Sequence, residues 1–141
     1  MVQELQKQRE AMAHQLREMR IQTRLGLYCP RLAVMRGVRT ELSYVLRDAK
    51  ESGEVIGELL KALGEMEFLF GPDLCRHLDE IYQRCVHAFT LRQQFTPLMA
   101  DEEQRRIVAS EAEELRWIFD QLSGLRNAFG PYLEIDSREE T

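Results

Sequence analysis

The sequence predicts an all-α protein: an antiparallel helical bundle of four to five helices with a long N-terminal helix. Apolar residues recur at spacings of three and four over long stretches, which is the period of an amphipathic helix. Glycine and proline gather at a few points between these stretches, and no strand-like alternation is found. With 141 residues, of which 44% are hydrophobic and 30% charged, one domain with a buried core is expected.

The first predicted element is a helix over residues 2–26, in a segment rich in good helix formers. Its apolar ridge, defined as Leu5, Met12, Leu16 and Met19, has spacings of seven, four and three. Such a narrow ridge is typical of a coiled-coil seam or of a helix that docks on another body. Residues 1–26 are therefore interpreted as a coiled-coil or docking segment, and its partner is either another copy or the rest of this chain.

The second predicted helix covers residues 31–50, after an interruption from Gly26 to Pro30, because proline suits the first turn of a helix. The same apolar face continues backwards through Leu25 and Tyr28, so one long kinked helix is the alternative. The predicted buried face comprises Leu32, Met35, Val38, Leu42, Val45, Leu46 and Ala49.

A third helix is predicted over residues 53–70, and the pair Gly57 and Gly64 on it suggests the close approach of another helix. Its predicted apolar face comprises Ile56, Leu59, Leu60, Leu63, Met66, Leu69 and Phe70. Gly71 and Pro72 then end this helix and begin the next.

The last two long helices are predicted over residues 72–95 and 101–129. Gly130 and Pro131 are expected to break the final helix, with residues 132–135 folding back and 136–141 forming a flexible tail. The bundle therefore spans residues 27–135. The inward face of the final helix is predicted to comprise Ile107, Val108, Glu111, Leu115, Ile118, Phe119, Leu122, Leu125 and Phe129.

Charge is unevenly distributed along the chain. Residues 1–50 carry a formal charge of +5 and the remainder −10. The two parts attract each other, or the first part attracts an anionic partner. Beside the apolar ridge lie Arg9, Arg17, Arg20 and Arg24, which are candidate contacts for such a partner. They lack interleaved aromatic residues and the protein is acidic as a whole, which argues against nucleic-acid binding.

No residue set points to catalysis. Cys75 with His77 and Cys85 with His87 are potential zinc ligands, but residues two apart on a helix face different directions. Glu-x-x-His pairs, nucleophile elbows and phosphate-binding glycine loops do not occur in the sequence. We therefore expect a non-enzymatic protein, and assign no catalytic, metal or cofactor residue.

One ionic interaction between helices is expected inside the bundle. Glu111 lies on the apolar stripe of the final helix, and Arg84 and Arg92 on the preceding helix are its candidate partners. A partly buried ion pair of this kind would fix the register between the two helices.

The sequence also bears on location. It holds no run of 18 apolar residues and no signal-peptide core, and its three cysteines form no disulfide framework. A cytoplasmic protein with reduced thiols is expected, with membrane association through the basic helix as the alternative.

Three stretches resemble a recurring type of uncharacterised small helical protein of bacteria. They are LGLYCPRL at residues 25–32, EFLFGPDL at 67–74, and WIFDQ at 117–121 with FGPYL at 129–133. The resemblance covers about residues 20–135 and implies a shared helical fold. Many members carry an apolar anchor before the N-terminal helix, whereas this chain begins directly at that helix, as a soluble variant or as a chain without its anchor.

The functional expectation is a helical scaffold or protein-interaction module that self-associates or forms part of a complex. Its contact surface would be the apolar ridge with the arginines beside it, because an apolar seam of this kind needs a cover. The alternative is a peripheral protein that binds a membrane or another anionic surface through the basic N-terminal helix.

Overall fold

A computed structural model of the chain describes residues 2–47 and 52–133, and these residues form helices without any strand. The all-α prediction is confirmed. The helices are α1 (Val2–Arg47), α2 (Ser52–Ala62), the short α3 (Met66–Leu69), α4 (Pro72–Gln94) and α5 (Asp101–Leu133).

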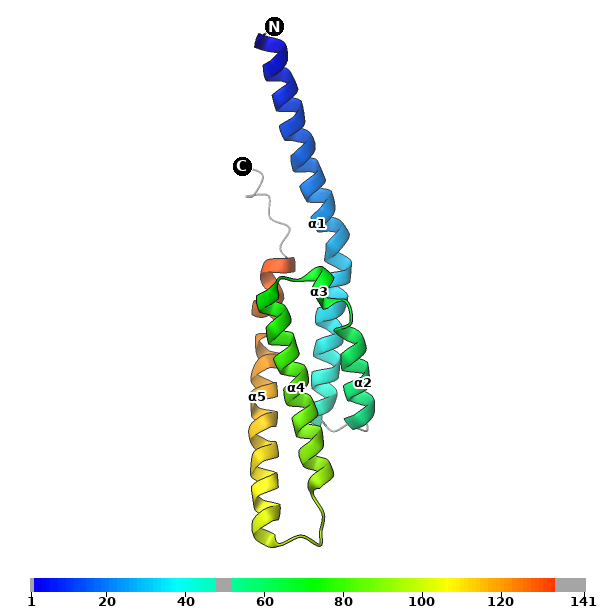
Figure 1. The fold of residues 1–141 in the computed structure, drawn as a ribbon, viewed down its shortest axis with the longest axis vertical. Helices are drawn as coiled ribbons and strands as arrows, with labels where there is room; N and C mark the ends of the chain where they lie inside the picture. The colour runs from blue at the N-terminus through cyan, green and yellow to red at the C-terminus, as the bar shows by residue number, and fades with distance from the viewer. Residues whose placement is uncertain (1, 48–51, 134–141) are drawn as a thin grey trace.

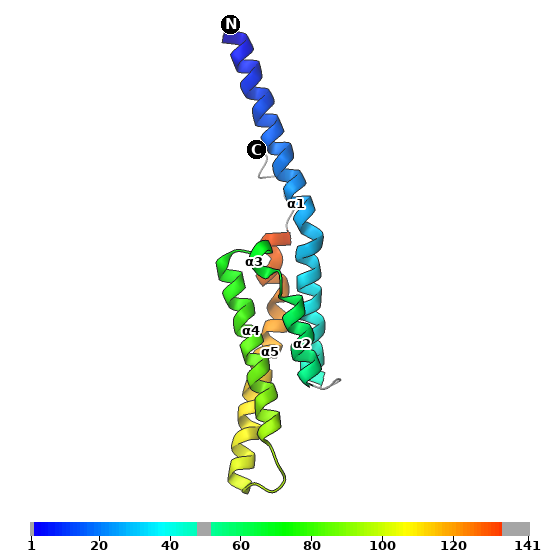
Figure 2. The same cartoon turned by 45° about the vertical axis from the view of Figure 1, so that its right-hand side comes forward.

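The C-terminal half of α1 forms an up-and-down bundle with α2, α4 and α5 (Figures 1 and 2). In this bundle α1 packs against α2 and α5, and α4 packs against the same two helices, so that neighbours run antiparallel. The N-terminal half of α1 projects from one end of the bundle. At the opposite end the α4–α5 hairpin extends beyond α1 and α2.

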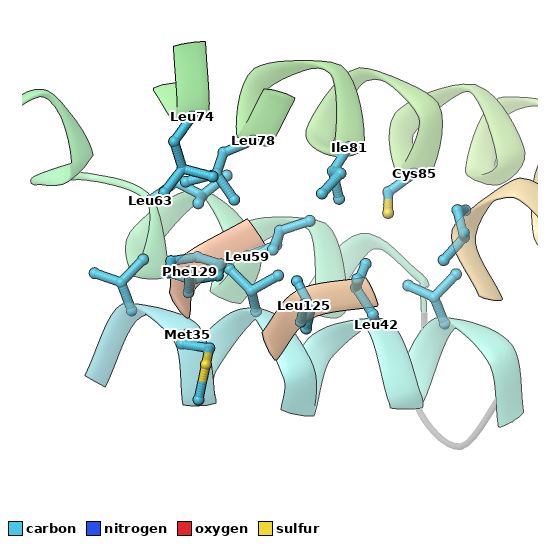
Figure 3. Packing of buried hydrophobic residues seen from close by; sticks show 14 of the residues in the cluster. Met35, Leu42, Leu59, Leu63, Leu74, Leu78, Ile81, Cys85, Leu125 and Phe129 are labelled. Atoms are coloured by element: carbon cyan, nitrogen blue, oxygen red, sulfur yellow. The ribbon is translucent and has the colours of Figure 1, made fainter. Parts of the chain in front are cut away.

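The core runs along the bundle axis and draws side chains from each long helix (Figure 3). Leu42 of α1, Leu59 of α2, Leu78 of α4 and Phe129 of α5 are completely buried. Full burial of one such side chain stabilises the fold by about 1.5–3 kcal/mol relative to exposure. The predicted core residues of residues 31–47 are largely confirmed, since Met35, Val38, Leu42 and Val45 are all buried.

The predicted interruption at Gly26–Pro30 is wrong, and the alternative of one long helix is confirmed. α1 continues through Pro30, and its axis changes direction near the point where it leaves the bundle (Figure 1). A proline inside a helix costs about 3 kcal/mol. Contacts of the following residue offset this cost, because Arg31 donates from Nε to Leu69 O (2.8 Å) and from Nη1 to Tyr132 O (3.2 Å).

The predicted helix over residues 53–70 is divided into α2 and α3 by a turn around Gly64, whose N–H donates to Lys61 O at 3.1 Å. The predicted close approach at Gly57 and Gly64 is also wrong. A Cβ added at Gly57 would meet nothing within 4 Å, and one at Gly64 would meet only carbonyls of its own turn. The close approach is instead at Gly37 of α1, where an added Cβ would lie 3.0 Å from the Ala62 Cβ.

The predicted break at Gly130–Pro131 is wrong, because α5 continues to Leu133. Aromatic packing holds this last turn in place. The ring of Phe70 meets the rings of Phe129 and Tyr132 edge to face, each at 5.2 Å between centroids. Ile135, the tail at 136–141 and the predicted end of the second helix at 48–50 lie outside the described residues.

Three residues predicted to face the core are exposed instead: Leu60, Val108 and Phe119. On α5 the buried stripe is Ile107, Glu114, Ile118, Leu125 and Phe129. Val108 and Phe119 each follow a buried isoleucine by one residue. They therefore lie about 100° around the helix from the core, beyond the face that the other helices cover.

Candidate interaction surface

The N-terminal half of α1 is helical but uncovered. All four residues of the apolar ridge are exposed, with between 53% and 63% of their surface accessible. The structure therefore brings these predicted contact residues together on one face of one helix, and the described part of the bundle does not cover them (Figure 1).

The ridge follows a coiled-coil spacing more completely than the four residues suggest. Starting at Val2, positions 2, 5, 9, 12, 16, 19 and 23 alternate in steps of three and four, which keeps them on one face. Arg9 and Thr23 are the polar residues of this series. The Thr23 hydroxyl donates to Met19 O at 2.8 Å, which satisfies it within the helix. A face of this pattern fits a partner helix along its whole length.

The predicted basic residues flank the ridge on one side. Arg17, Arg20 and Arg24 are three, four and seven residues apart, so they share that side of the helix, and Arg9 lies between them and the ridge. Glu10, His14 and Glu18 lie on the opposite face, where His14 Nε2 approaches Glu18 Oε1 at 3.1 Å. The surface on this side of the ridge is therefore positive, while Glu10 and Glu18 point away from the ridge.

A second feature, the α4–α5 ion cluster, joins the two helices inside the bundle. Arg92 Nε lies 2.7 Å from Glu111 Oε1, which agrees with the expected pairing of Glu111. Arg84, the other expected partner of Glu111, instead contacts Glu114 at 3.2 Å. Its guanidinium also stacks over the Trp117 ring at 4.7 Å from the centroid.

Glu114 is the buried acid of this cluster, with 8% of its surface accessible, and sequence reasoning missed it. The signal was present, because Glu114 lies seven residues after Ile107 and four before Ile118, both buried. His87 Nδ1 also approaches its carboxylate at 3.3 Å. The cluster thus links α4 to α5 through paired side chains.

The cysteine and histidine pairs do not form a metal site. Cys85 is buried, whereas His87 is exposed. Burial, together with the charge of Glu114, raises the pKa of the Cys85 thiol to about 12, so this thiol stays protonated and is a poor metal ligand and nucleophile. Among residues 2–47 and 52–133, no group of three or more potential metal-binding side chains is found.

Another exposed apolar surface lies on the α4–α5 hairpin, at the end of the molecule opposite the ridge. It is a shallow groove, here called the hairpin groove, whose apolar lining includes Phe95, Val108 and Ala112. Asp101 and Arg105 stand at its edge. Sequence reasoning missed it because Val108 was assigned to the core.

The fold and this surface define a class of protein: an up-and-down four-helix bundle with a projecting amphipathic helix. Comparison with protein-family models, curated proteins and solved structures found no match to the chain. The resemblance to small bacterial helical proteins therefore stays a prediction. No helix in the described part of the chain has the length and hydropathy needed to cross a bilayer.

Proposed function

We propose that the protein is a non-enzymatic scaffold or interaction module, which self-associates or joins a complex through the N-terminal half of α1. The observation that carries the proposal is the exposure of the whole apolar ridge on a helix that leaves the bundle. More than half of the surface of each ridge residue is accessible and can still be buried. A partner helix is the element that buries such a face.

The stability of the projecting half supports the same conclusion. A helical segment without tertiary packing is only marginally stable in water, because most of the stability of a helix in a protein comes from packing against other elements. Here about half of α1 has no cover from the bundle, although its residues favour helix. Contact with a partner would supply the packing that the bundle gives to the C-terminal half of the same helix.

Sedimentation velocity over a wide range of protein concentrations tests self-association. The test variant is Met12→Glu with Leu16→Glu, which places charge on the ridge. The matched control is Leu25→Glu. Leu25 is as exposed as Leu16 (51% against 53%), but nine residues further on it lies on the opposite face of α1.

We expect the native protein and the control to associate as concentration rises, and the ridge variant to remain monomeric with unchanged circular dichroism. Association that is equally strong in the ridge variant would contradict a role for the ridge. If the ridge instead joins a complex with another protein, we expect the ridge variant to lose that binding and the control to keep it.

A second candidate function rests on the arginines beside the ridge. An apolar face flanked by Arg9, Arg17 and Arg20, all exposed, matches helices that lie on anionic membrane surfaces. Co-sedimentation with vesicles of phosphatidylcholine alone, or with added phosphatidylserine, separates this function from the first. Binding that requires the anionic lipid and falls with Arg17→Glu and Arg20→Glu supports it, and no binding to either vesicle excludes it.

A further inference from the structure

The two ends of the molecule differ in which helices project. At one end α1 extends beyond the bundle, and at the other end α4 and α5 extend beyond α1 (Figures 1 and 2). The end of α1 is marked by Arg92, which donates from Nη2 to Val45 O at 3.4 Å and contacts Glu111. The part of α5 before Glu111 therefore lies past Arg47, the last described residue of α1, where neither α1 nor α2 covers the hairpin among the described residues.

The hairpin groove occupies this uncovered end. Phe95 and Val108, which line the groove, are 41% and 54% exposed, and Phe119, further along α5 and outside the groove, is 56% exposed. Val108, Ala112 and Phe119 lie four and seven residues apart, so they share one face of α5. This face is a second apolar stripe of helical period without a cover among the described residues.

Charge also differs between the two ends. The projecting residues 2–24 hold five Lys or Arg and three Asp or Glu, and the acids Glu10 and Glu18 lie away from the ridge. The first turn of α5 holds three acids in succession, Asp101, Glu102 and Glu103, all exposed. Asp101 stands at the groove itself, together with Arg105. The projecting helix is thus basic, whereas the first turn of α5, ahead of Arg105 and Arg106, is acidic.

We propose that the projecting half of α1 of one copy lies in the hairpin groove of a second copy, with its ridge on Val108 and Phe119. The proposal rests on the proposed function and names its partner. The docked helix runs antiparallel to α5, as α1 does within its own bundle, which brings Arg20 towards the acidic first turn of α5. Each copy offers one helix and one groove, so the contact is heterologous and the assembly is an open head-to-tail chain.

The alternative, pairing of two α1 helices, is less favourable on electrostatic grounds. In a parallel pair in register, the spacing of the ridge places Arg9 of one helix against Arg9 of the other at a core position. Burial of two like charges at one layer is destabilising. The hairpin groove instead offers apolar side chains to the ridge, with no second copy of Arg9 opposite the first.

A mixing experiment tests the head-to-tail contact. The helix variant is the ridge variant described above, with Met12→Glu and Leu16→Glu, and it keeps an intact groove. The groove variant carries Val108→Glu and keeps an intact ridge. All three substitutions are at exposed positions, and circular dichroism with thermal melting verifies the fold of each variant. The matched control for the groove is Leu60→Glu, since Leu60 is equally exposed on α2.

For the native protein and the Leu60→Glu control, we expect light scattering to show assemblies that grow with concentration. Each variant alone is expected to be monomeric, with association weakened roughly tenfold or more. An equimolar mixture of the two variants is expected to form dimers and nothing larger, because only one intact helix and one intact groove can meet.

Two outcomes overturn the proposal. If the groove variant assembles like the native protein while the helix variant does not, α1 pairs with another surface; the proposed function then stands and this inference fails. If the native protein remains monomeric at every concentration, no contact between copies exists. Charge reversal gives an independent check: Arg20→Glu and Asp101→Lys should each weaken assembly, and the mixture of the two variants should restore it.

Discussion

The Tyr132 hydroxyl accepts a hydrogen bond from the backbone N–H of Gly71 at 3.1 Å, and thereby joins the last turn of α5 to the start of α4. We expect Tyr132→Phe to lower the free energy of unfolding by about 1 kcal/mol, because a partly buried N–H loses its partner. Urea unfolding measures the change. An unchanged unfolding midpoint would show that water replaces the hydroxyl.

Gly71 is required at this contact because a Cβ there would lie 2.7 Å from the Tyr132 hydroxyl oxygen. We expect Gly71→Ala to destabilise the native protein by about 1–3 kcal/mol through this overlap. In the Tyr132→Phe background the oxygen is absent, so the same substitution should cost much less. The double-mutant cycle measures this coupling, and additive effects would contradict the close approach.

Arg31 links α1 to α3 and to the last turn of α5, because it donates to both Leu69 O and Tyr132 O. Its guanidinium also lies over the Tyr132 ring, at 5.3 Å from the centroid. Arg31→Lys keeps the charge but cannot donate to Leu69 O and Tyr132 O together. We expect a loss of about 1–2 kcal/mol in denaturant unfolding. The control Arg36→Lys, at an exposed position five residues along α1, should leave the unfolding midpoint unchanged.

The α4–α5 ion cluster should contribute mainly through the buried carboxylate of Glu114. Arg84→Ala leaves that acid without its guanidinium partner and should cost about 1–3 kcal/mol, a value reduced by the partial exposure of Arg84. The combined variant Arg84→Ala with Arg92→Ala should melt at a clearly lower temperature. Thermal stability and oligomeric state that both remain unchanged would remove the basis for a role of the cluster in helix register.

The titration of Cys85 should make the free energy of unfolding depend on pH in the alkaline range. Its pKa is raised from 9.0 to about 12 in the folded protein by burial and by Glu114, so above about pH 9 the unfolded chain loses the thiol proton while the folded chain keeps it. The contribution of Cys85 to the free energy of unfolding is therefore fully present below about pH 9. It is lost as pH rises towards 12, by up to about 1.4 kcal/mol per pH unit. Cys85→Ala lowers stability through a cavity but should flatten this slope, as urea unfolding between pH 8 and 10 would measure. An equal slope in the variant would assign the dependence to other groups.

Helical periodicity was sufficient to predict the fold class and most of the core. Leu42, Leu59, Ile118 and Phe129 were all assigned to buried faces and are buried. The errors occurred at glycine and proline, where local propensity competes with tertiary contacts. α1 passes through Pro30 because Arg31 is anchored, and α5 passes Pro131 because Phe70 packs on both Phe129 and Tyr132.

The candidate surface was only partly predictable. The apolar ridge followed from the spacing of Leu5, Met12 and Leu16, since a stripe can be read from one helix alone. The hairpin groove could not be found in this way. Val108 and Phe119 look like core residues by hydropathy. The exposure of Val108 depends on where α1 ends relative to α5, which is a relation between helices distant in sequence.

Hydrogen exchange of the backbone amides of residues 5–24, measured at low and high protein concentration, tests the central claim most directly. An uncovered helix opens easily, and a partner of the same chain protects it in proportion to its occupancy. We predict slow exchange in this segment at high concentration and fast exchange on dilution, while the bundle residues of α1, such as Val38 and Leu42, stay protected throughout. Exchange in residues 5–24 that is independent of concentration would contradict self-association through the apolar ridge.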